Sequence, residues 1–348
     1  MDRKSRSAVK RWTSHDIAVD LGTANTLVYV EGHGIVINEP SVVATNRRTK
    51  RVVAVGTSAK NMIGRTPRSI IAAKPLVDGV VSDFEITELM LKSFVDRLHR
   101  EHRVLVQRPR MIVGLPSGVT EVEKRAVEEA ARSSGARRIY LIEEPIAAAI
   151  GSGMKLDDEI GSMIVDIGGG TTEIAILASG GVVMTRSLRI AGDELTTAVH
   201  HVLRDEYNML IGERTAEDIK TKIGAVSKTK TGDKMSVRGR NILTGLPHEI
   251  KLPSDVLRLP LTKQLRPIID AIKTLLEEAP PELLSDIMQK GIYVSGGGAL
   301  LQGIGSLIEQ ECKIKVVVPK NALTAVVEGA ATALSDPVYY RDVLMVSE

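Results

Sequence analysis

The sequence has few of the residues on which several classes of protein depend. It contains one cysteine, Cys312, among 348 residues, which excludes a disulfide framework and a cysteine-based zinc site. Aromatic residues make up 3%, so the core must be aliphatic, and a stacking platform for single-stranded nucleic acid is not expected. No apolar run reaches the roughly 18 residues of a membrane-spanning helix, and no signal peptide is visible. A cytoplasmic location is therefore expected.

Net charge is also small, and it is unevenly placed. The chain carries +3 in total, of which residues 1–15 contribute +4, so the remainder sums to −1. A near-neutral body is not expected to bind nucleic acid. The basic tail is either an electrostatic tether or an ordinary solvated terminus.

Hydrophobic residues at 43% and charged residues at 26% are typical of a globular chain, and the length fits roughly two domains. Strand-like and helix-like segments alternate, which predicts an α/β fold. The predicted strands are Ile17–Asp20, Leu27–Val30, Met111–Leu115, Ile139–Ile142, Ser162–Asp166 and Ile292–Ser295. The predicted helices are Ile86–Arg100, a segment capped by Thr120 and Glu123, a segment opened by Glu144-Pro145, a polar region reaching residue 224, and 261–278, with turns and edge strands at 225–250.

An internal repeat is the strongest signal. Ile17–Tyr29 and Ile164–Ile176 share an order of apolar strand, Asp, apolar residue, Gly, three small or polar residues, Thr, and a second β-rich run. The aspartates, Asp20 and Asp166, are 146 residues apart, a plausible length for each half of a duplicated protein. Two ordinary hairpins with glycine turns are the alternative, but that interpretation leaves both carboxylates unexplained.

Each repeated segment has the chemistry of a phosphate site. A strand that ends in Asp places a carboxylate at the edge of the sheet where ligands of α/β proteins bind, and small residues let backbone amides approach an anion. Hydroxyl groups can add hydrogen bonds to phosphate, and these belong to Thr23, Thr26, Thr171 and Thr172. The carboxylates would repel a phosphate unless a cation lay between them, so the pattern predicts Mg²⁺ held by Asp20 and Asp166 through water.

Two further features could complete such a site. Gly296-Gly297-Gly298 follows a strand and is neither a P-loop nor a Rossmann fingerprint, and it suits close approach to a base and sugar. Glu144 precedes Pro145 at the end of a predicted strand, where it could orient an attacking water or simply cap a helix, whereas Glu143 is expected to be structural. Glu217 and Lys220 share a helix face, and a surface ion pair is the simpler interpretation of the residues alone.

These motifs resemble the actin, sugar-kinase and heat-shock ATPase superfamily. The resemblance rests on Asp20–Thr26, Glu143–Ala149, Asp166–Glu173 and Gly296–Leu301. Within that superfamily Asn38–Val42, Ile190–Glu194 and Gly212–Glu217 resemble the MreB family of bacterial actins, and the resemblance covers the chain from about Asp16 to Ser335.

The resemblance implies a duplicated two-lobe actin-like fold with a nucleotide cleft between the lobes and a smaller insert on each. It implies core IA in 1–34, 76–149 and 322–348, insert IB in 35–75, core IIA in 150–187 and 251–321, and insert IIB in 188–250. It implies that phosphate binds at Gly22, Thr23, Ala24, Asn25, Gly168, Gly169, Gly170 and Thr171, and that Glu144 and Thr171 position the hydrolytic water. It also implies nucleoside contacts from Glu213, Glu217, Lys220, Gly296, Gly297 and Gly298.

The family also implies a slow Mg²⁺-dependent ATPase that forms filaments on the inner membrane face and organises cell-wall synthesis through protein partners. Arg103–Arg108 matches the place of a lipid-inserting loop, with Val104, Leu105 and Val106 as its apolar residues, and a buried strand start is the alternative. Residues 1–15 are a second candidate membrane contact, although their apolar face is thin. A sugar or acetate kinase would need a catalytic aspartate and larger inserts, and a chaperone ATPase would need a peptide-binding domain, so both are less favoured.

Overall fold

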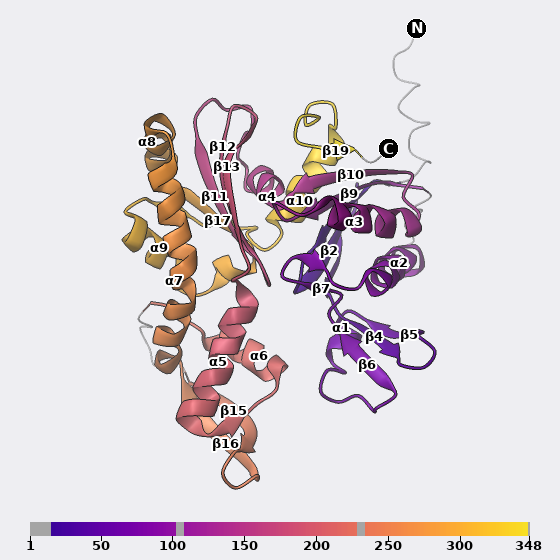
Figure 1. Ribbon diagram of the computed structural model, residues 1–348, viewed down its shortest axis with the longest axis vertical. Coiled ribbons are helices and arrows are strands. Elements are labelled where there is room, and N and C mark those ends of the chain that lie inside the picture. The colour runs from indigo at the N-terminus through magenta and orange to yellow at the C-terminus, as the bar shows by residue number, and fades with distance from the viewer. Residues whose placement is uncertain (1–14, 102–107, 228–233, 347–348) are drawn as a thin grey trace. The chain divides into compact units, whose positions relative to one another are not determined.

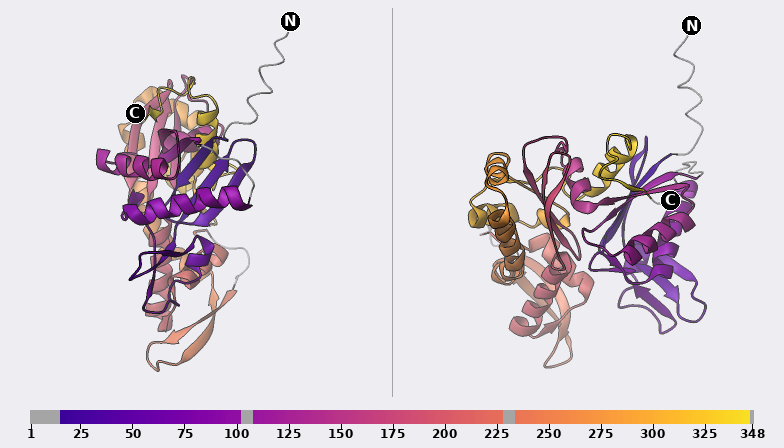
Figure 2. Two further views of the ribbon diagram at one scale, coloured as in Figure 1. Left: turned by 90° about the vertical axis from the view of Figure 1, so that its right-hand side faces the viewer. Right: turned by 45° about the horizontal axis from the view of Figure 1, so that its top comes forward.

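The computed structural model describes residues 15–101, 108–227 and 234–346. The chain divides into two compact units, the first formed by Met1–Glu143 with Val327–Glu348 and the second by Glu144–Val326. Each unit contains a large mixed sheet, a three-stranded sheet and packed helices, as expected for an α/β fold (Figures 1 and 2). The finer division into four subdomains stays a prediction.

The first unit is built on a six-stranded sheet in the order β19-β10-β9-β1-β2-β3. Strands β1, β9 and β10 are parallel, whereas β1, β2 and β3 form an antiparallel meander. Ile17, Val19 and Leu21 of β1 pack in the core with side chains of two helices, so Asp20 belongs to the opposite face of the sheet. These elements are β1 (Ile17–Leu21), β2 (Asn25–Val30), β3 (Gly34–Pro40), β9 (Arg110–Leu115), β10 (Arg138–Glu143), β19 (Met345–Val346), α2 (Phe84–Glu101) and α3 (Glu121–Ser133).

The smaller elements of the first unit follow β3 along the chain. A three-stranded sheet has the order β5-β4-β6, and β7 pairs with β8 in a short hairpin. The predicted capping box is present at the start of α3, where Thr120 and Glu123 each bond the backbone amide of the other. The elements are β4 (Val43–Asn46), β5 (Val52–Val55), α1 (Thr57–Lys60), β6 (Ile70–Ala73), β7 (Leu76–Val77) and β8 (Val80–Val81).

The second unit has a five-stranded sheet in the order β13-β12-β11-β17-β18. Here β11, β17 and β18 are parallel, and β11, β12 and β13 form an antiparallel meander. Helix α4 packs against β11 and β12 on one face, and α7 and α8 lie on the other face (Figure 1). The elements are α4 (Glu144–Gly151), β11 (Ser162–Ile167), β12 (Thr172–Ala178), β13 (Gly181–Leu188), α7 (Asp255–Glu278), α8 (Pro281–Lys290), β17 (Ile292–Ser295), η2 (Gly297–Leu300), α9 (Ile304–Cys312) and β18 (Val316–Val317). The last helix, α10 (Ala325–Ser335), begins at the end of this unit and belongs for most of its length to the first unit, which includes Val327–Glu348.

Between β13 and α7 the chain forms a second, smaller group of elements. Two helices pack on each other and on a three-stranded sheet of order β14-β15-β16. Its elements are α5 (Gly192–Tyr207), β14 (Met209–Leu210), α6 (Glu213–Ile223), β15 (Lys234–Asn241) and β16 (Pro247–Pro253).

The predicted internal repeat is confirmed in the strand pairing. Leu21 pairs with Thr26 across the first hairpin and Ile167 with Thr172 across the second, so both connecting loops have the same length and the same offset of 146 residues. In each unit the strand that carries the aspartate also has a parallel neighbour on its other side, β9 or β17. The duplication therefore extends from the motif to the sheet around it.

Two of the predicted elements were wrong in extent. The polar region that follows the second repeat and reaches residue 224 is predicted to be helical, but β13 occupies its first part as far as Leu188, because the repeat continues the meander. The helix predicted at 261–278 begins at Asp255 and contains Pro260 and Pro267. An interior proline removes a backbone donor, and α7 accommodates two of them. Among the described residues, no helix is long and apolar enough to cross a membrane.

Candidate functional site

The first repeated hairpin is held closed by a neighbouring serine. Ser41 donates its hydroxyl to the carbonyl of Gly22 at 2.6 Å and its amide to the carbonyl of Ala24 at 3.0 Å. The hydroxyl oxygen of Thr23 accepts a bond from the amide of Gly79 at 2.9 Å. A Cβ atom on Gly22 would lie 2.8 Å from the carbonyl oxygen of Asn25, so the turn requires glycine at this position. The expected small residues thus form one tight turn, Gly22–Asn25, beside Asp20.

The second hairpin is held by a helix instead. The amide of Gly168 bonds to the carbonyl of Thr171 at 2.8 Å, which closes the turn. The amides of Gly192 and Asp193, in the first turn of α5, donate to the carbonyls of Gly168 and Gly169 at 3.2 and 2.8 Å. Gly170 completes the turn, and Thr171 is largely buried. The carbonyls of the turn are thereby bound within the protein, which suits a loop that presents amides to an anion.

Two of the four threonine hydroxyls have a different role from the one predicted. Thr26 and Thr172 are fully buried, and each is bonded within the protein: Thr26 to the hydroxyl of Ser41 at 2.8 Å and Thr172 to the carbonyl of Ile190 at 2.7 Å. The prediction that these two hydroxyls bind phosphate is therefore wrong. The sequence pattern could not reveal the burial of these two threonines, because a threonine in the turn and a threonine in the strand that follows the turn look alike in sequence.

Asp166 is a buried carboxylate at the end of β11. It is 5% exposed and accepts a hydrogen bond of 2.6 Å from the hydroxyl of Ser295 in β17. Burial raises the pKa of Asp166 to about 6, and the bond from Ser295 lowers it in part. Ser295 was identified in the sequence only as the residue before three glycines, so its bond to the aspartate was missed. Asp20 occupies the corresponding position in β1 and is half-buried.

The third glycine turn is shaped mainly by packing on β11. Gly296 has a φ of +80°, and a Cβ atom there would lie 2.3 Å from the carbonyl oxygen of Ile167. A Cβ atom on Gly298 would lie 2.3 Å from a methyl carbon of the same isoleucine. Gly297 alone of the three is exposed. Two of the glycines predicted to line a ligand therefore have a structural reason to be glycine, and Gly297 has the open surface.

Helix α6 carries three of the six residues predicted to contact a nucleoside. Glu213 begins the helix and is exposed, whereas Glu217 and Lys220 are half-buried. The ammonium of Lys220 donates to the carbonyl of Gly192 at 2.8 Å and to the hydroxyl of Thr196 at 2.9 Å. Lys220 is therefore bonded to α5, a contact that the sequence pattern did not predict.

Two adjacent glutamates differ in their surroundings, as predicted. Glu143 ends β10 and accepts a bond of 2.8 Å from the hydroxyl of Ser117, which gives it a structural role. Glu144 is the first residue of α4, is 7% exposed and precedes Pro145. A buried carboxylate at the start of a short helix is compatible with both predicted roles, a cap and a water-orienting group.

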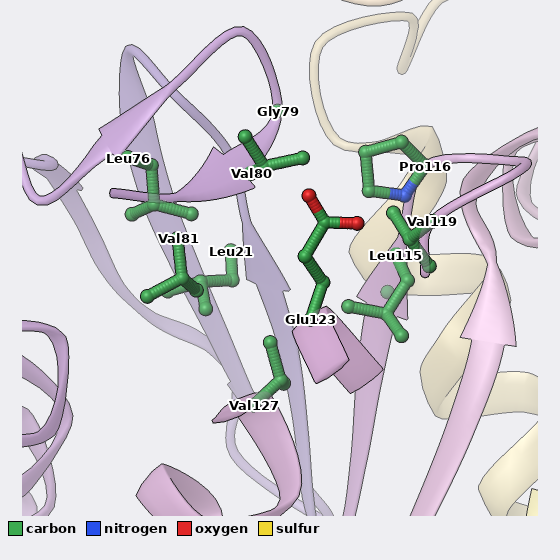
Figure 3. A pocket seen from close by; sticks show the side chains of 11 residues that line it. Leu21, Leu76, Gly79, Val80, Val81, Leu115, Pro116, Val119, Glu123 and Val127 are labelled. Atoms are coloured by element: carbon green, nitrogen blue, oxygen red, sulfur yellow. The ribbon is translucent and has the colours of Figure 1, made fainter. Parts of the chain in front are cut away.

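Figure 3 shows a small cavity in the first unit that is separate from these residues. Its lining is mostly aliphatic, and the carboxylate of Glu123 points toward it (Figure 3). Its wall includes Leu21, which precedes Gly22 of the first hairpin, and Gly79, whose amide bonds to Thr23. None of the residues predicted to bind nucleotide or metal lines this cavity, so it does not serve as the candidate site.

Comparison with known proteins places the sequence among bacterial cell-shape proteins. The profile of the MreB/Mbl protein family matches residues 14–341. The chain is 45% identical to the cell shape-determining protein Mbl of Bacillus subtilis over 93% of this chain and 96% of the relative. It is 46% identical to the cell shape-determining protein MreB of Escherichia coli over 92% and 93% of the two chains. The crystal structure of MreB5 of Spiroplasma citri bound to ADP superimposes with a TM-score of 0.88, at 38% identity over 95% of this chain and 98% of the neighbour.

Proposed function

The chain belongs to the MreB/Mbl family and has its actin-like fold, and from this we propose that it binds and slowly hydrolyses ATP with Mg²⁺ and polymerises into filaments. The observation that carries the nucleotide proposal is the pair of matching hairpins, each an aspartate-ending strand followed by a tight small-residue turn. Crystal structures of MreB5 of Spiroplasma citri bound to ADP and to AMPPNP support the same ligand class.

In this proposal each unit contributes its own hairpin to the phosphates. The turns Gly22–Asn25 of the first unit and Gly168–Thr171 of the second supply backbone amides, apart from the amide of Gly168, which closes its own turn. Two carbonyls of each turn accept bonds from neighbouring segments of the protein. Glu213, Glu217 and Lys220 contact the nucleoside, and Gly297, flanked by Gly296 and Gly298, offers the exposed backbone beside it.

The donor chemistry at Asp166 fits Mg²⁺. Its buried carboxylate has a raised pKa, and a bound cation would offset that cost of burial. The described residues contain no cluster of three or more His, Cys, Asp or Glu that could enclose a metal ion. A site with only one or two protein carboxylates is typical of Mg²⁺, because this ion keeps several of its bound waters. Asp20 and Asp166 would hold it through those waters, and the ion would neutralise phosphate charge.

Glu144 and Thr171 would position the attacking water. The proposal predicts that Glu144→Ala retains ATP affinity but releases phosphate about 100-fold more slowly, because the carboxylate acts on the transition state and not on bound ATP. Phosphate release under single-turnover conditions, with ATP affinity measured in parallel, checks this. If the variant released phosphate at the wild-type rate, Glu144 would be a helix cap and not a water-orienting group.

Assembly and location follow from the family. We expect filaments at the inner face of the cell membrane that organise wall synthesis with protein partners and maintain cell shape. The predicted membrane contacts, Val104, Leu105, Val106 and residues 1–15, lie outside the described residues except for His15. They stay a prediction, in which each subunit binds the membrane weakly and the many subunits of a filament together bind it stably.

The membrane prediction can be tested directly. Co-sedimentation of the protein with anionic vesicles and ATP should show binding that weakens in high salt. Leu105→Ser and a chain lacking residues 1–15 separate the two candidate contacts. If both variants bind like the wild type, neither element is the contact. Electron microscopy of the same samples reports whether filaments are present.

A further inference from the structure

Gly192 lies at a junction between three elements of the second unit. Its amide donates to the carbonyl of Gly168 in the second hairpin, and its carbonyl accepts from Lys220 of α6 and from the hydroxyl of Thr196, at 2.8 and 3.0 Å. Lys220 also donates to Thr196 at 2.9 Å. One peptide segment of α5 therefore connects the turn Gly168–Thr171 to the helix that carries the predicted nucleoside contacts.

The junction is closely packed as well as hydrogen-bonded. A Cβ atom on Gly192 would lie 3.2 Å from the carbonyl oxygen of Gly168 and 3.4 Å from the ammonium of Lys220. Thr196 is 6% exposed, so the bonds it makes are shielded from water. A hydrogen bond from a charged donor is stronger than one between neutral groups, particularly where water is excluded. A displacement of Lys220 would therefore be transmitted to the hairpin through Gly192.

We propose that Lys220 is a positioning residue for the phosphate-binding turn, acting through Gly192 and Thr196, in addition to any contact with the nucleoside. The proposal rests on the proposed ATP-binding function. In this arrangement the ammonium draws the first turn of α5 toward α6, which sets the amides of Gly192 and Asp193 against the hairpin carbonyls. Binding at the nucleoside side of α6 and order at the phosphate turn are then coupled.

Inorganic tripolyphosphate separates this role from a nucleoside contact, because it has the phosphates of ATP and no base or sugar. Titration calorimetry with Mg²⁺ would measure the affinity of full-length protein for ATP and for tripolyphosphate. Lys220→Met should weaken both ligands by about tenfold. Thr196→Val, which removes only the buried hydroxyl, should weaken both roughly threefold, and Thr196→Ser should restore wild-type affinity.

Two comparison variants define the alternatives. Lys222→Met changes an exposed lysine of the same helix and should leave both affinities unchanged. Glu217→Gln should weaken ATP and not tripolyphosphate, which is the signature of a nucleoside contact alone. Thermal unfolding of every variant confirms that the fold is retained.

The affinities of the variants for ATP and tripolyphosphate distinguish the alternatives. If Lys220→Met weakens ATP but leaves tripolyphosphate unchanged, Lys220 contacts only the nucleoside and the proposal is overturned. If Lys220→Met does not fold, the Thr196→Val variant provides the test. The proposal is then overturned if this variant binds tripolyphosphate as tightly as the wild type does. Wild-type protein that binds neither ligand overturns the proposed ATP-binding function together with this inference.

Discussion

The two repeated hairpins have the same strand pairing, but different groups of the protein form hydrogen bonds to their turns. In the first, the carbonyl of Gly22 accepts from the hydroxyl of Ser41, which follows β3. In the second, the carbonyl of Gly168, at the same position of the repeat, accepts from the amide of Gly192 at the start of α5. The carbonyl of Gly22 is therefore bonded by a side chain that could be replaced, and the carbonyl of Gly168 by the backbone of a helix.

This difference shows what a duplicated motif preserves. The strand pairing and the tight turn follow from the repeated residues themselves, so both units have them. The groups that hold each turn come from chain segments outside the repeat, and each unit supplies its own. We therefore expect the two hairpins to respond differently to substitution.

The largest difference is expected between the two aspartates. Asp166→Asn should reduce the contribution of Mg²⁺ to ATP affinity by about 100-fold, and Asp20→Asn by about tenfold, because a charge in a buried, low-dielectric setting interacts more strongly. Asp166 is 5% exposed, whereas Asp20 is half-buried. ATP titrations with Mg²⁺ and with EDTA measure this contribution. Unchanged Mg²⁺ dependence in Asp166→Asn would refute the two-hairpin metal site.

The same aspartate should make the metal-free protein less stable as pH rises. The pKa of Asp166 is raised from 3.8 to about 6, so the folded state keeps a proton that the unfolded state releases. The unfolding free energy therefore falls between about pH 4 and 6, and Asp166→Asn avoids this loss, which reaches about 3 kcal/mol at pH 8. Urea unfolding with EDTA at pH 4 and pH 8 measures the difference.

Ser295→Ala provides the companion measurement. The bond from Ser295 lowers the pKa of Asp166, so its removal should move the pH-dependent loss of stability to higher pH. Curves for wild type and Asp166→Asn that run parallel from pH 4 to 8 would show that Asp166 does not titrate as described.

The smallest effects concern the groups that hold the two turns. Ser41→Ala leaves the buried hydroxyl of Thr26 and the carbonyl of Gly22 without this partner, so we expect a loss of about 1–3 kcal/mol in stability. Gly192→Ala should leave stability nearly unchanged, since alanine favours the helix, but lower ATP affinity several-fold by displacing Gly168. Thermal unfolding and ATP titration of both variants test this contrast. Equal loss of stability in both would mean that the two turns are held alike.

The sequence predicted the repeat, the α/β class and the residues of both turns, because strand periodicity and glycine spacing are local signals. It could not predict which groups hold the turns. Ser41 and Gly192 lie in the segments Asn38–Val42 and Ile190–Glu194, which the resemblance singled out without assigning a role. Their function depends on contacts between segments far apart in the chain, as does the bond from Lys220 to Gly192.

The packing of Gly298 on Ile167 has a consequence for genetics. The two residues share one small volume, since a Cβ atom on Gly298 would lie 2.3 Å from a methyl carbon of Ile167, the residue between Asp166 and Gly168. An alanine at position 298 would therefore push on the strand end that carries the proposed metal and phosphate residues, and we expect its defect to resemble that of a variant in the proposed nucleotide site. A smaller side chain at position 167 would restore the lost space, so selection for revertants of Gly298→Ala should recover second-site changes at Ile167.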